Sequence, residues 1–287
     1  MAVHQMQRQR VGVAKMTISR DGEQSLLFEI DGSVATLTIN RPHRGNALDP
    51  SVLTALEEAW ARVEADPAIR VAIITGAGDR HFCTGADVGA LQVGTGTLHN
   101  RPNAEVNRFT PRMVRMSKPV ICAVNGLCNG GGLHFVADCD IVIASATSYF
   151  MDSHVSVGQV SALETQGIAR RAGVGAALLL ALAGRSYRMC AERAWTLGMV
   201  DLLENSAAAV MNRAREIATM IAANSPQAVA LTKRAIWATV EMAEPSSSDL
   251  GWELLKSHWS HPDFAEGPAA FAENREPRWS LDPNARG

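Results

Sequence analysis

Short apolar runs recur along the first half of the chain at the spacing expected of strands. Residues 34–40 read VATLTIN, a partly alternating run rich in β-branched side chains. The runs VAIITG (71–76) and PVICAVNG (119–126) are continuously apolar and end in glycine, and CDIVIAS (139–145) repeats the pattern in outline. These runs predict strands, of which the continuously apolar ones are buried on both faces.

A helix is expected between the first two of these strands. Asp49 is suited to cap it, and Pro50 suits its first position. Apolar side chains then follow at helical spacing: Leu53, Leu56, Trp60 and Val63. The pattern predicts an amphipathic helix over residues 51–65, and strands that alternate with helices are typical of an α/β fold.

Strand signals stop at about residue 170, and helical patterns follow. Helices are expected over 172–183, from 191 to 197, and over 206–223, 225–243, 249–260 and 266–275. Ser225 and Pro226 mark one of these helix starts. The apolar faces exceed what one small layer can cover, so this region is expected to pack on a neighbouring chain.

Two segments lack such periodicity. Residues 88–112 are rich in glycine, threonine and asparagine, which predicts a lid or binding loop. Residues 1–20 carry four basic side chains and no acid, and they lack the apolar core of a secretory signal. We expect a frayed N-terminal extension there, although an organelle transit peptide has the same composition.

Composition narrows the class of protein. The 287 residues are 47% hydrophobic and 20% charged, with a formal net charge of −2, as in an ordinary globular protein. No domain-sized basic field is present, so nucleic acid is not an expected partner. No apolar run approaches the ~20 residues of a membrane helix, so no membrane partner is expected either.

The cysteines and histidines give no sign of a metal site. Five cysteines are scattered without a C-x-x-C pair, which favours buried, reduced thiols in a cytoplasmic protein. No two histidines have metal-ligand spacing on a helix face. We therefore expect no metal.

Sequence motifs in a fixed order identify a family. The motifs are NRPHRGNAL (40–48), FCTGADV (82–88), AVNGLCNGGGLHFVADCDIVIAS (123–145) and AERAWTLGMVD (191–201), followed by SPQAVALTKRA (225–235). In this order and spacing they resemble the enoyl-CoA hydratase/isomerase family, the crotonase superfamily. The resemblance spans nearly the whole chain, from about residue 25 to about residue 280.

The resemblance implies an α/β fold, namely a crotonase-like spiral of ββα units with two roughly perpendicular sheets and a C-terminal helical trimerisation region. On this basis the chain divides into an extension (1–22), an α/β core (23–203) and the helical region (204–287). It also implies a homotrimer or a dimer of trimers. The implied ligand is an acyl-CoA thioester of fatty acid metabolism, and no cofactor is expected beyond the coenzyme A of that substrate.

The glycine run GGG (130–132) gains a role from this resemblance. Family members stabilise an enolate at the thioester carbonyl with two backbone N–H groups. Ala86 and Gly131 match these two donors, and Gly130 lies beside them. Glycine removes the side chain that would block the approach, and a helix N-terminus adds its positive dipole end.

Three further positions match contacts to coenzyme A, and a fourth departs from the relatives. Ala47 and Asp87 match positions near the adenine end, although Asp87 also suits a structural turn. Phe271 matches an aromatic residue that helps hold coenzyme A, in some relatives from the next subunit. Relatives tend to carry lysine where this chain has Asn274, so a nearby arginine such as Arg275 is a candidate for the phosphate contact.

The chain departs from the family at the two catalytic glutamates, whose positions are occupied by His134 and His154. Histidine has an unperturbed pKa of about 6.5 and serves as a general acid or base. Two imidazoles close together push their pKa values apart, so one can be a neutral base and the other a protonated donor. Asp152 and Glu164 are candidates to orient one of these imidazoles. The alternatives are that Asp152 is a turn residue and that Glu164 is a solvated loop acid.

These residues predict an acyl-CoA-processing enzyme that catalyses hydration, isomerisation or a related reaction. One alternative is a hydrolase that cleaves a C–C bond in a β-dicarbonyl substrate, because some relatives with that activity use histidines with an acidic partner. Another is a non-catalytic acyl-CoA-binding protein that retains the oxyanion loop. A purely structural trimer is disfavoured, since packing alone would not require both the GAD motif and the glycine run.

Overall fold

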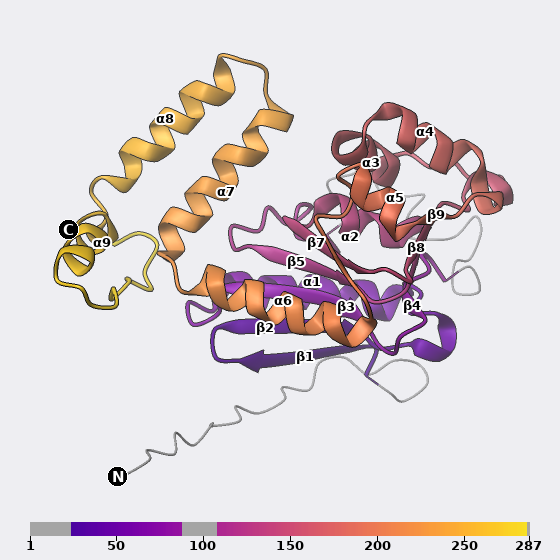
Figure 1. Cartoon of the computed structure of the whole chain (residues 1–287), viewed down its shortest axis with the longest axis horizontal. Helices are drawn as coiled ribbons and strands as arrows, with labels where there is room; N and C mark the ends of the chain where they lie inside the picture. Colours follow the sequence, from indigo (N-terminus) through magenta and orange to yellow (C-terminus); the bar gives the residue numbers. More distant parts are fainter. Residues whose placement is uncertain (1–23, 88–107, 286–287) are drawn as a thin grey trace, which may run out of the picture.

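The computed structural model describes residues 24–87 and 108–285, and a six-stranded sheet forms its centre (Figure 1). In spatial order the strands are β1 (Leu26–Asp31), β2 (Val34–Ile39), β3 (Val71–Gly76), β5 (Val120–Val124), β7 (Ile141–Ser145) and β10 (Leu202–Glu204). β1 and β2 are antiparallel, and the other neighbours are parallel. The strands expected over 34–40, 71–76, 119–126 and 139–145 are confirmed.

The continuously apolar strands are buried on both faces. Ala72 and Ile74 of β3 pack into a cluster that includes helix α1 (Pro50–Ala65), whereas Val71 and Ile73 pack with α6 (Ala207–Ala222) on the other face. Because neither face meets water, the period-two alternation disappears from the sequence. The expected cap of α1 is confirmed, since the Asp49 side chain accepts a hydrogen bond from the Val52 N–H.

A smaller sheet lies beside the first and consists of β4 (His81–Cys83), β6 (Leu127–Asn129), β8 (Tyr149–Met151) and β9 (Met189–Cys190). β3, β5 and β7 each turn directly into a strand of this sheet. The turn after β5 depends on Gly126, where a Cβ atom would lie 2.4 Å from the Arg80 carbonyl carbon. β6 then runs into the glycine turn Gly130–Gly132 and helix α2 (Leu133–Asp138), which completes a ββα unit.

The next helices differ from the sequence prediction. The helix expected over 172–183 is confirmed as α4 (Val174–Leu182), whereas α3 (Leu163–Ala172) was not expected, and Gly173, with φ +84°, separates the two. α5 (Ala191–Thr196) follows. The expected end of strand signals near residue 170 is also wrong, since β9 and β10 follow it. Strands of two and three residues are too short to show a period.

The C-terminal helices are α6, α7 (Pro226–Glu241), α8 (Ser246–His258) and α9 (Pro262–Ala272). α6 covers one face of the large sheet and forms a buried cluster with it. α7 and α8 form a hairpin that stands away from the sheets (Figure 1). Among the described residues, no helix is long and apolar enough to cross a membrane.

A buried arginine fixes the loop that leads from β2 into α1. Nη2 of Arg41 lies 2.9 Å from Oδ2 of Asp87 and 3.2 Å from Oδ2 of Asp49, and Nη1 donates to the Ala47 carbonyl at 2.8 Å. Burial raises the pKa of Asp49, but hydrogen bonds from Ser51 and Val52 and the charge of Arg41 outweigh it, so the net pKa is lowered. Arg41 therefore pairs with two carboxylates of this loop, and its charge helps to lower the pKa of Asp49.

Replacement of this arginine tests its structural role. Arg41→Met is expected to lower the free energy of unfolding by about 3–5 kcal/mol, because it leaves buried carboxylates without their counter-charge. Urea unfolding at fixed protein concentration measures the change. Arg44→Met, at the exposed arginine three residues on, serves as the control and is expected within about 0.5 kcal/mol of wild type. Equal stabilities of the two variants would contradict this account.

Candidate active site

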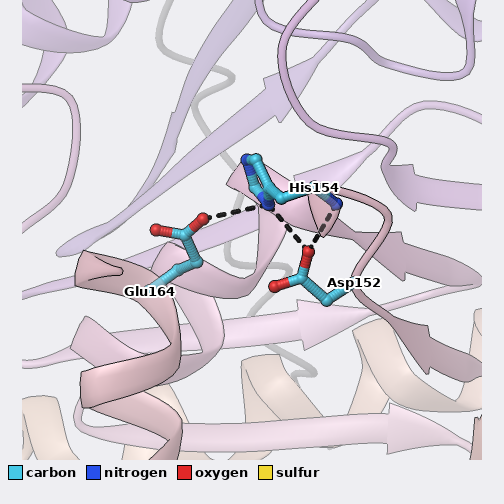
Figure 2. Close-up of side chains that lie close together, drawn as sticks. All are labelled: Asp152, His154 and Glu164. Carbon is cyan, nitrogen blue, oxygen red and sulfur yellow. Dashed lines mark hydrogen bonds and ion pairs between the residues drawn. The ribbon is translucent and has the colours of Figure 1, made fainter. Parts of the chain in front are cut away.

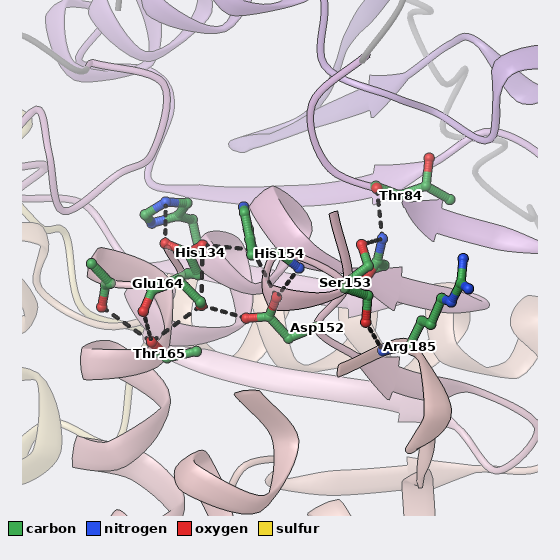
Figure 3. Close-up of polar contacts among 12 residues, drawn as sticks. Thr84, His134, Asp152, Ser153, His154, Glu164, Thr165 and Arg185 are labelled. Atoms are coloured by element: carbon green, nitrogen blue, oxygen red, sulfur yellow. Dashed lines mark hydrogen bonds and ion pairs between the residues drawn. The ribbon is translucent and has the colours of Figure 1, made fainter. Parts of the chain in front are cut away.

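Four ionisable side chains from three segments meet beside the glycine turn (Figures 2 and 3). His134 lies in the first turn of α2, Asp152 and His154 follow β8, and Glu164 lies in the first turn of α3. α2 and α3 pack against each other, which brings together residues about 30 positions apart. The structure thus gathers both predicted histidines and both predicted acidic partners at one place.

Asp152 fixes the ring of His154. Its side chain is fully buried, and its Oδ1 accepts the His154 backbone N–H at 2.9 Å and lies 2.7 Å from His154 Nδ1 (Figure 2). The other carboxylate oxygen accepts a hydrogen bond from the Ser161 hydroxyl. A proton on Nδ1 therefore bonds to Asp152, and Nε2 is left for a substrate. No sequence pattern had singled out Ser161 as a partner of Asp152.

Opposing effects set the charges of this pair. Burial raises the pKa of Asp152, but hydrogen bonds from His154 and Ser161 outweigh it, and the net pKa is lowered. The hydrogen bond to Asp152 raises the pKa of His154, aided by the charge of Glu164 and opposed by burial. Asp152 is therefore ionised, and His154 holds a proton more readily than a free imidazole.

Glu164 lies between the two histidines. Its Oε1 is 3.2 Å from Nδ1 of His154, and its Oε2 is 3.4 Å from Nε2 of His134 (Figure 3). The solvated-loop alternative for this residue is wrong, because Glu164 is buried at the start of a helix. The interruption at Gly173 explains the difference, since it allows a separate helix to begin earlier in the chain.

His134 has the opposite tendency to His154. Its side chain is 12% exposed, and the ring of Phe109 meets it edge to face with 5.2 Å between centroids. Burial lowers the pKa of His134, and His154 lowers it further, against the charges of Glu164 and Asp138. The two imidazoles therefore differ, since His134 holds a proton less readily than a free imidazole and His154 more readily.

The three glycines of the turn meet different steric demands. Gly130 has φ +51°, and its missing Cβ would lie 3.3 Å from Cε1 of His154. A Cβ on Gly132 would lie 2.6 Å from the Cys83 carbonyl oxygen, so α2 can pack on β4 only without it. At Gly131 a Cβ atom would make only ordinary van der Waals contacts, at 3.4 Å from Gly85 Cα and 3.5 Å from Ala86 N.

The backbone N–H of Ala86 lies beside this Cβ position of Gly131. Leu48 pairs with Ala86 in a parallel bridge, in which the Leu48 N–H donates to Gly85 O and the Asp87 N–H donates to Leu48 O. Such a bridge uses the groups on either side of Ala86, so its own N–H points away from Leu48. Gly131 is the second residue of its helical turn, where N–H groups lack intrahelical partners. The backbone nitrogen of Ala86 thus lies close to Gly131, 3.5 Å from its Cβ position.

Asn129 links the loops beside the glycine turn. Its side-chain amide donates to the Thr84 carbonyl and to the Ser153 hydroxyl, each at 3.0 Å (Figure 3). One residue thus ties the GAD loop, the glycine turn and the segment that carries His154. It is buried, and the sequence analysis did not single it out.

The predicted coenzyme A contacts divide into two groups. Ala47 and Asp87 both lie on the Arg41 cluster, next to Ala86. Phe271, in contrast, is 88% exposed on α9, far from α2 and α3 (Figure 1). Arg275 forms ion pairs with Glu266 and Glu273, so it is not a free cation for a phosphate within the single chain.

One group of side chains among the described residues has ligand atoms close enough to hold a metal ion. It is Asp152, His154 and Glu164, whose ligand atoms lie within 4.8 Å of one another. The 2.7 Å contact between Nδ1 and Oδ1 is a hydrogen-bond distance, shorter than the ~3.3 Å between ligand atoms of a tetrahedral zinc ion. A proton accounts for this contact.

Comparison with known proteins agrees with this geometry. The family model for enoyl-CoA hydratase/isomerase matches residues 29–282. (E)-Benzylidenesuccinyl-CoA hydratase of Thauera aromatica is 37% identical over 255 residues, which cover 87% of this chain and 96% of the relative. The short-chain-enoyl-CoA hydratase of Clostridium acetobutylicum is 32% identical over 254 residues, or 88% and 96% of the two chains.

Solved structures show the same architecture. An enoyl-CoA hydratase/isomerase from Mycobacterium paratuberculosis superposes with a TM-score of 0.81 at 37% identity, covering 90% of this chain and 99% of the other. The enoyl-CoA hydratase of Bacillus anthracis gives 0.81 at 28% identity, over 90% and 100% of the two chains. Because the family model and these relatives span nearly all of the described fold, the chain is an enzyme that belongs to the enoyl-CoA hydratase/isomerase family.

Proposed function

We propose that the enzyme adds water to an α,β-unsaturated acyl-CoA thioester, or catalyses the reverse dehydration, with His134 and His154 as its acid/base pair. The observation that carries this proposal is that His134, His154 and Glu164 meet beside Ala86 and Gly131, the two positions that match the family's oxyanion donors. The names of the Thauera and Clostridium relatives, both hydratases of CoA thioesters, agree with it.

Charge develops first on the thioester oxygen. In the proposed step this oxygen accepts hydrogen bonds from the N–H groups of Ala86 and Gly131 as the enolate forms. Removal of one such donor typically costs 10²–10³ in kcat, about 3–4 kcal/mol. Both donors are backbone groups held by the Leu48 bridge and the glycine turn, so little reorganisation accompanies the reaction.

The protons move between water, the two histidines and the substrate. Neutral His134 takes a proton from water as the water oxygen bonds to C3, and the electron pair of the double bond moves toward the thioester oxygen. Protonated His154 then delivers its Nε2 proton to C2. Glu164 lies 3.4 Å from Nε2 of His134 and stabilises the positive charge that this imidazole gains. After the product leaves, solvent takes the extra proton from His134 and returns one to Nε2 of His154. Without bound water, the same pair can move a proton between carbons, which is isomerisation.

Hydrolysis of a C–C bond in a β-dicarbonyl substrate is the second candidate. The Asp152–His154 contact favours it, because a carboxylate that orients an imidazole is also the arrangement that activates water toward a carbonyl carbon. Turnover of a β-diketone without turnover of enoyl-CoA would select this function. Tight acyl-CoA binding without either reaction would select the non-catalytic binder.

The pH dependence of turnover tests the assignment of the two histidines. Activity should fall in acid, below pH 6.5, because the pKa of His134 lies below the ordinary histidine value of 6.5 and protonation removes the base. It should fall in alkali, above pH 6.5, because the pKa of His154 is raised above 6.5 and loss of its proton removes the acid. Asp152→Asn removes the largest cause of the raised pKa of His154, so the alkaline limb should move about one unit toward acid. Crotonyl-CoA hydration, followed from pH 5 to 9, measures both limbs.

Two variants complete this test. His134→Ala and His154→Ala are each expected to lose ~10² or more in kcat. His43→Ala, at an exposed histidine in the loop before Ala47, is the matched control and should retain wild-type kcat. An alkaline limb that does not move in Asp152→Asn would rule out His154 as the acid.

The oxyanion space is tested by Gly131→Ala. A methyl group there meets its neighbours at 3.4 Å or more, so the fold should be retained, but the methyl occupies the space where the thioester oxygen binds. The expected result is a 10²–10³ loss of kcat with the melting temperature within about 2 °C of wild type. Gly251→Ala, on α8 with nothing within 4 Å, is the control. A Gly131→Ala variant with full activity would exclude this oxyanion site.

We also propose a cytoplasmic homotrimer or dimer of trimers. Large apolar side chains on α7, α8 and α9 are exposed in the single chain, namely Ile236, Val240, Trp252, Leu255, Trp259, Phe264 and Phe271. Phe271 lies too far from its own site to contact a ligand there, and a neighbouring subunit would bring it to one (Figure 1). The cytoplasmic location rests on cysteine use, since Cys83, Cys122, Cys128 and Cys139 are free and buried.

Light scattering tests the assembly. The expected mass is three or six times the 30.7 kDa of one chain. Trp252→Glu together with Leu255→Glu should dissociate the assembly, because the desolvation of unpaired charges in an apolar interface is unfavourable. Glu253→Gln between them is the control, since that exposed side chain already carries a charge. A monomeric wild-type protein would contradict the proposal.

A further inference from the structure

A cavity of about 480 Å³ opens beside His134 and is bounded by three segments. Residues 108–115 form one wall, α2 contributes His134 and Asp138 four residues apart on one face, and α3 contributes Leu163, Gln166 and Arg170. The volume is that of a small-ligand site. Because His134 belongs to both, the cavity continues directly from the proposed reaction centre.

The lining is unusual in its charge, because four arginines share it: Arg108, Arg112, Arg115 and Arg170. Arg108 forms an ion pair with Glu57 at 2.8 Å, and Arg112 with Glu241 at 3.2 Å. Within the described part of the chain, Arg115 and Arg170 form no ion pair shorter than 4 Å. The acid in the lining is Asp138, which is buried and accepts a hydrogen bond from the Thr110 hydroxyl.

The positive charge is not neutralised within the cavity. Burial raises the pKa of Asp138, which weakens its hold on a negative charge. Burial and the neighbouring charge of Arg112 lower the pKa of Arg170, so the two guanidinium groups repel each other. Arg170 is exposed and Arg112 is partly buried, and an anion between the two guanidinium groups would relieve their repulsion.

Arg112 also has an unused donor. Its guanidinium stacks on the ring of Trp237, 4.4 Å from the centroid, and Nη2 faces Glu241. Nη1 is buried and has no hydrogen-bond partner among the described residues. Because this nitrogen is covered by protein atoms, it does not bond to a ligand in the cavity, and Arg112 contributes its charge to the lining rather than that donor.

We propose that this cavity binds a carboxylate at the far end of the acyl group, so that the substrates are CoA thioesters of dicarboxylic acids. This inference rests on the proposed function, since it assigns the acyl group to the cavity next to His134. Guanidinium groups match a carboxylate in shape and charge, and Met113, Val114 and Leu163 provide apolar contacts for the connecting carbons. The adenine end of coenzyme A belongs elsewhere in this arrangement, near Ala47 and Asp87.

Equilibrium binding of two saturated thioesters tests the inference without any turnover. Adipoyl-CoA and hexanoyl-CoA have equal chain length, and only the first carries a distal carboxylate. Titration calorimetry on the wild-type protein is expected to show adipoyl-CoA binding at least ~10-fold more tightly, the value of one charge-assisted hydrogen bond. Arg170→Gln should abolish this preference, and Arg170→Lys should retain part of it.

Controls separate the possible failures. Arg193→Gln, at an exposed arginine on α5 outside the cavity, should keep the wild-type preference. Binding of hexanoyl-CoA by Arg170→Gln shows that the variant is folded. Equal affinity of the wild-type protein for the two thioesters, or a preference that persists in Arg170→Gln, would overturn this inference and leave the hydratase proposal intact. Failure of both thioesters to bind would overturn both this inference and the hydratase proposal.

Discussion

The site depends on one steric constraint, which is the close approach of the glycine turn to the second sheet. Gly132 lies so near the Cys83 carbonyl that a single methyl group would be placed 2.6 Å from its oxygen. This contact seats the start of α2 on β4, and it thereby sets the position of Gly131 opposite Ala86 and the direction of His134. Asn129 secures the same junction by hydrogen bonds to both neighbouring loops. Every other feature of the site is built on this junction.

A second layer of organisation is electrostatic. Two carboxylates and two imidazoles share a largely buried space, where unpaired charge is costly. The cost is reduced because Asp152 and Glu164 each face an imidazole, and because one imidazole stays neutral. The hydrogen bond to Asp152 favours the charge on His154, whereas burial disfavours a charge on His134. The same contacts make His154 hold a proton more readily and His134 less readily, which is the division of roles that the proposed acid/base pair uses.

The surroundings of the site divide its tasks among different parts of the fold. The Arg41 cluster holds the loops beside the oxyanion space, and the arginine-lined cavity extends from His134 on the other side. The C-terminal hairpin carries exposed apolar residues, and Phe271 lies far from the site of its own chain. Catalysis, recognition of the acyl group and assembly can therefore be changed by separate substitutions.

The sequence by itself determined the features that depend on local chemistry. Continuous apolar runs gave the central strands, Asp49 and Ser225 gave helix starts, and the ordered motifs gave the family and the likeness of Ala86 and Gly131 to oxyanion donors. Short strands such as β9 escaped detection because two residues cannot show a period. Only the tertiary structure decided that Glu164 is buried between the histidines, that Asp152 holds His154, and that four arginines line one cavity. Burial and charge pairing arise from contacts between distant segments, and local sequence does not encode which segments meet.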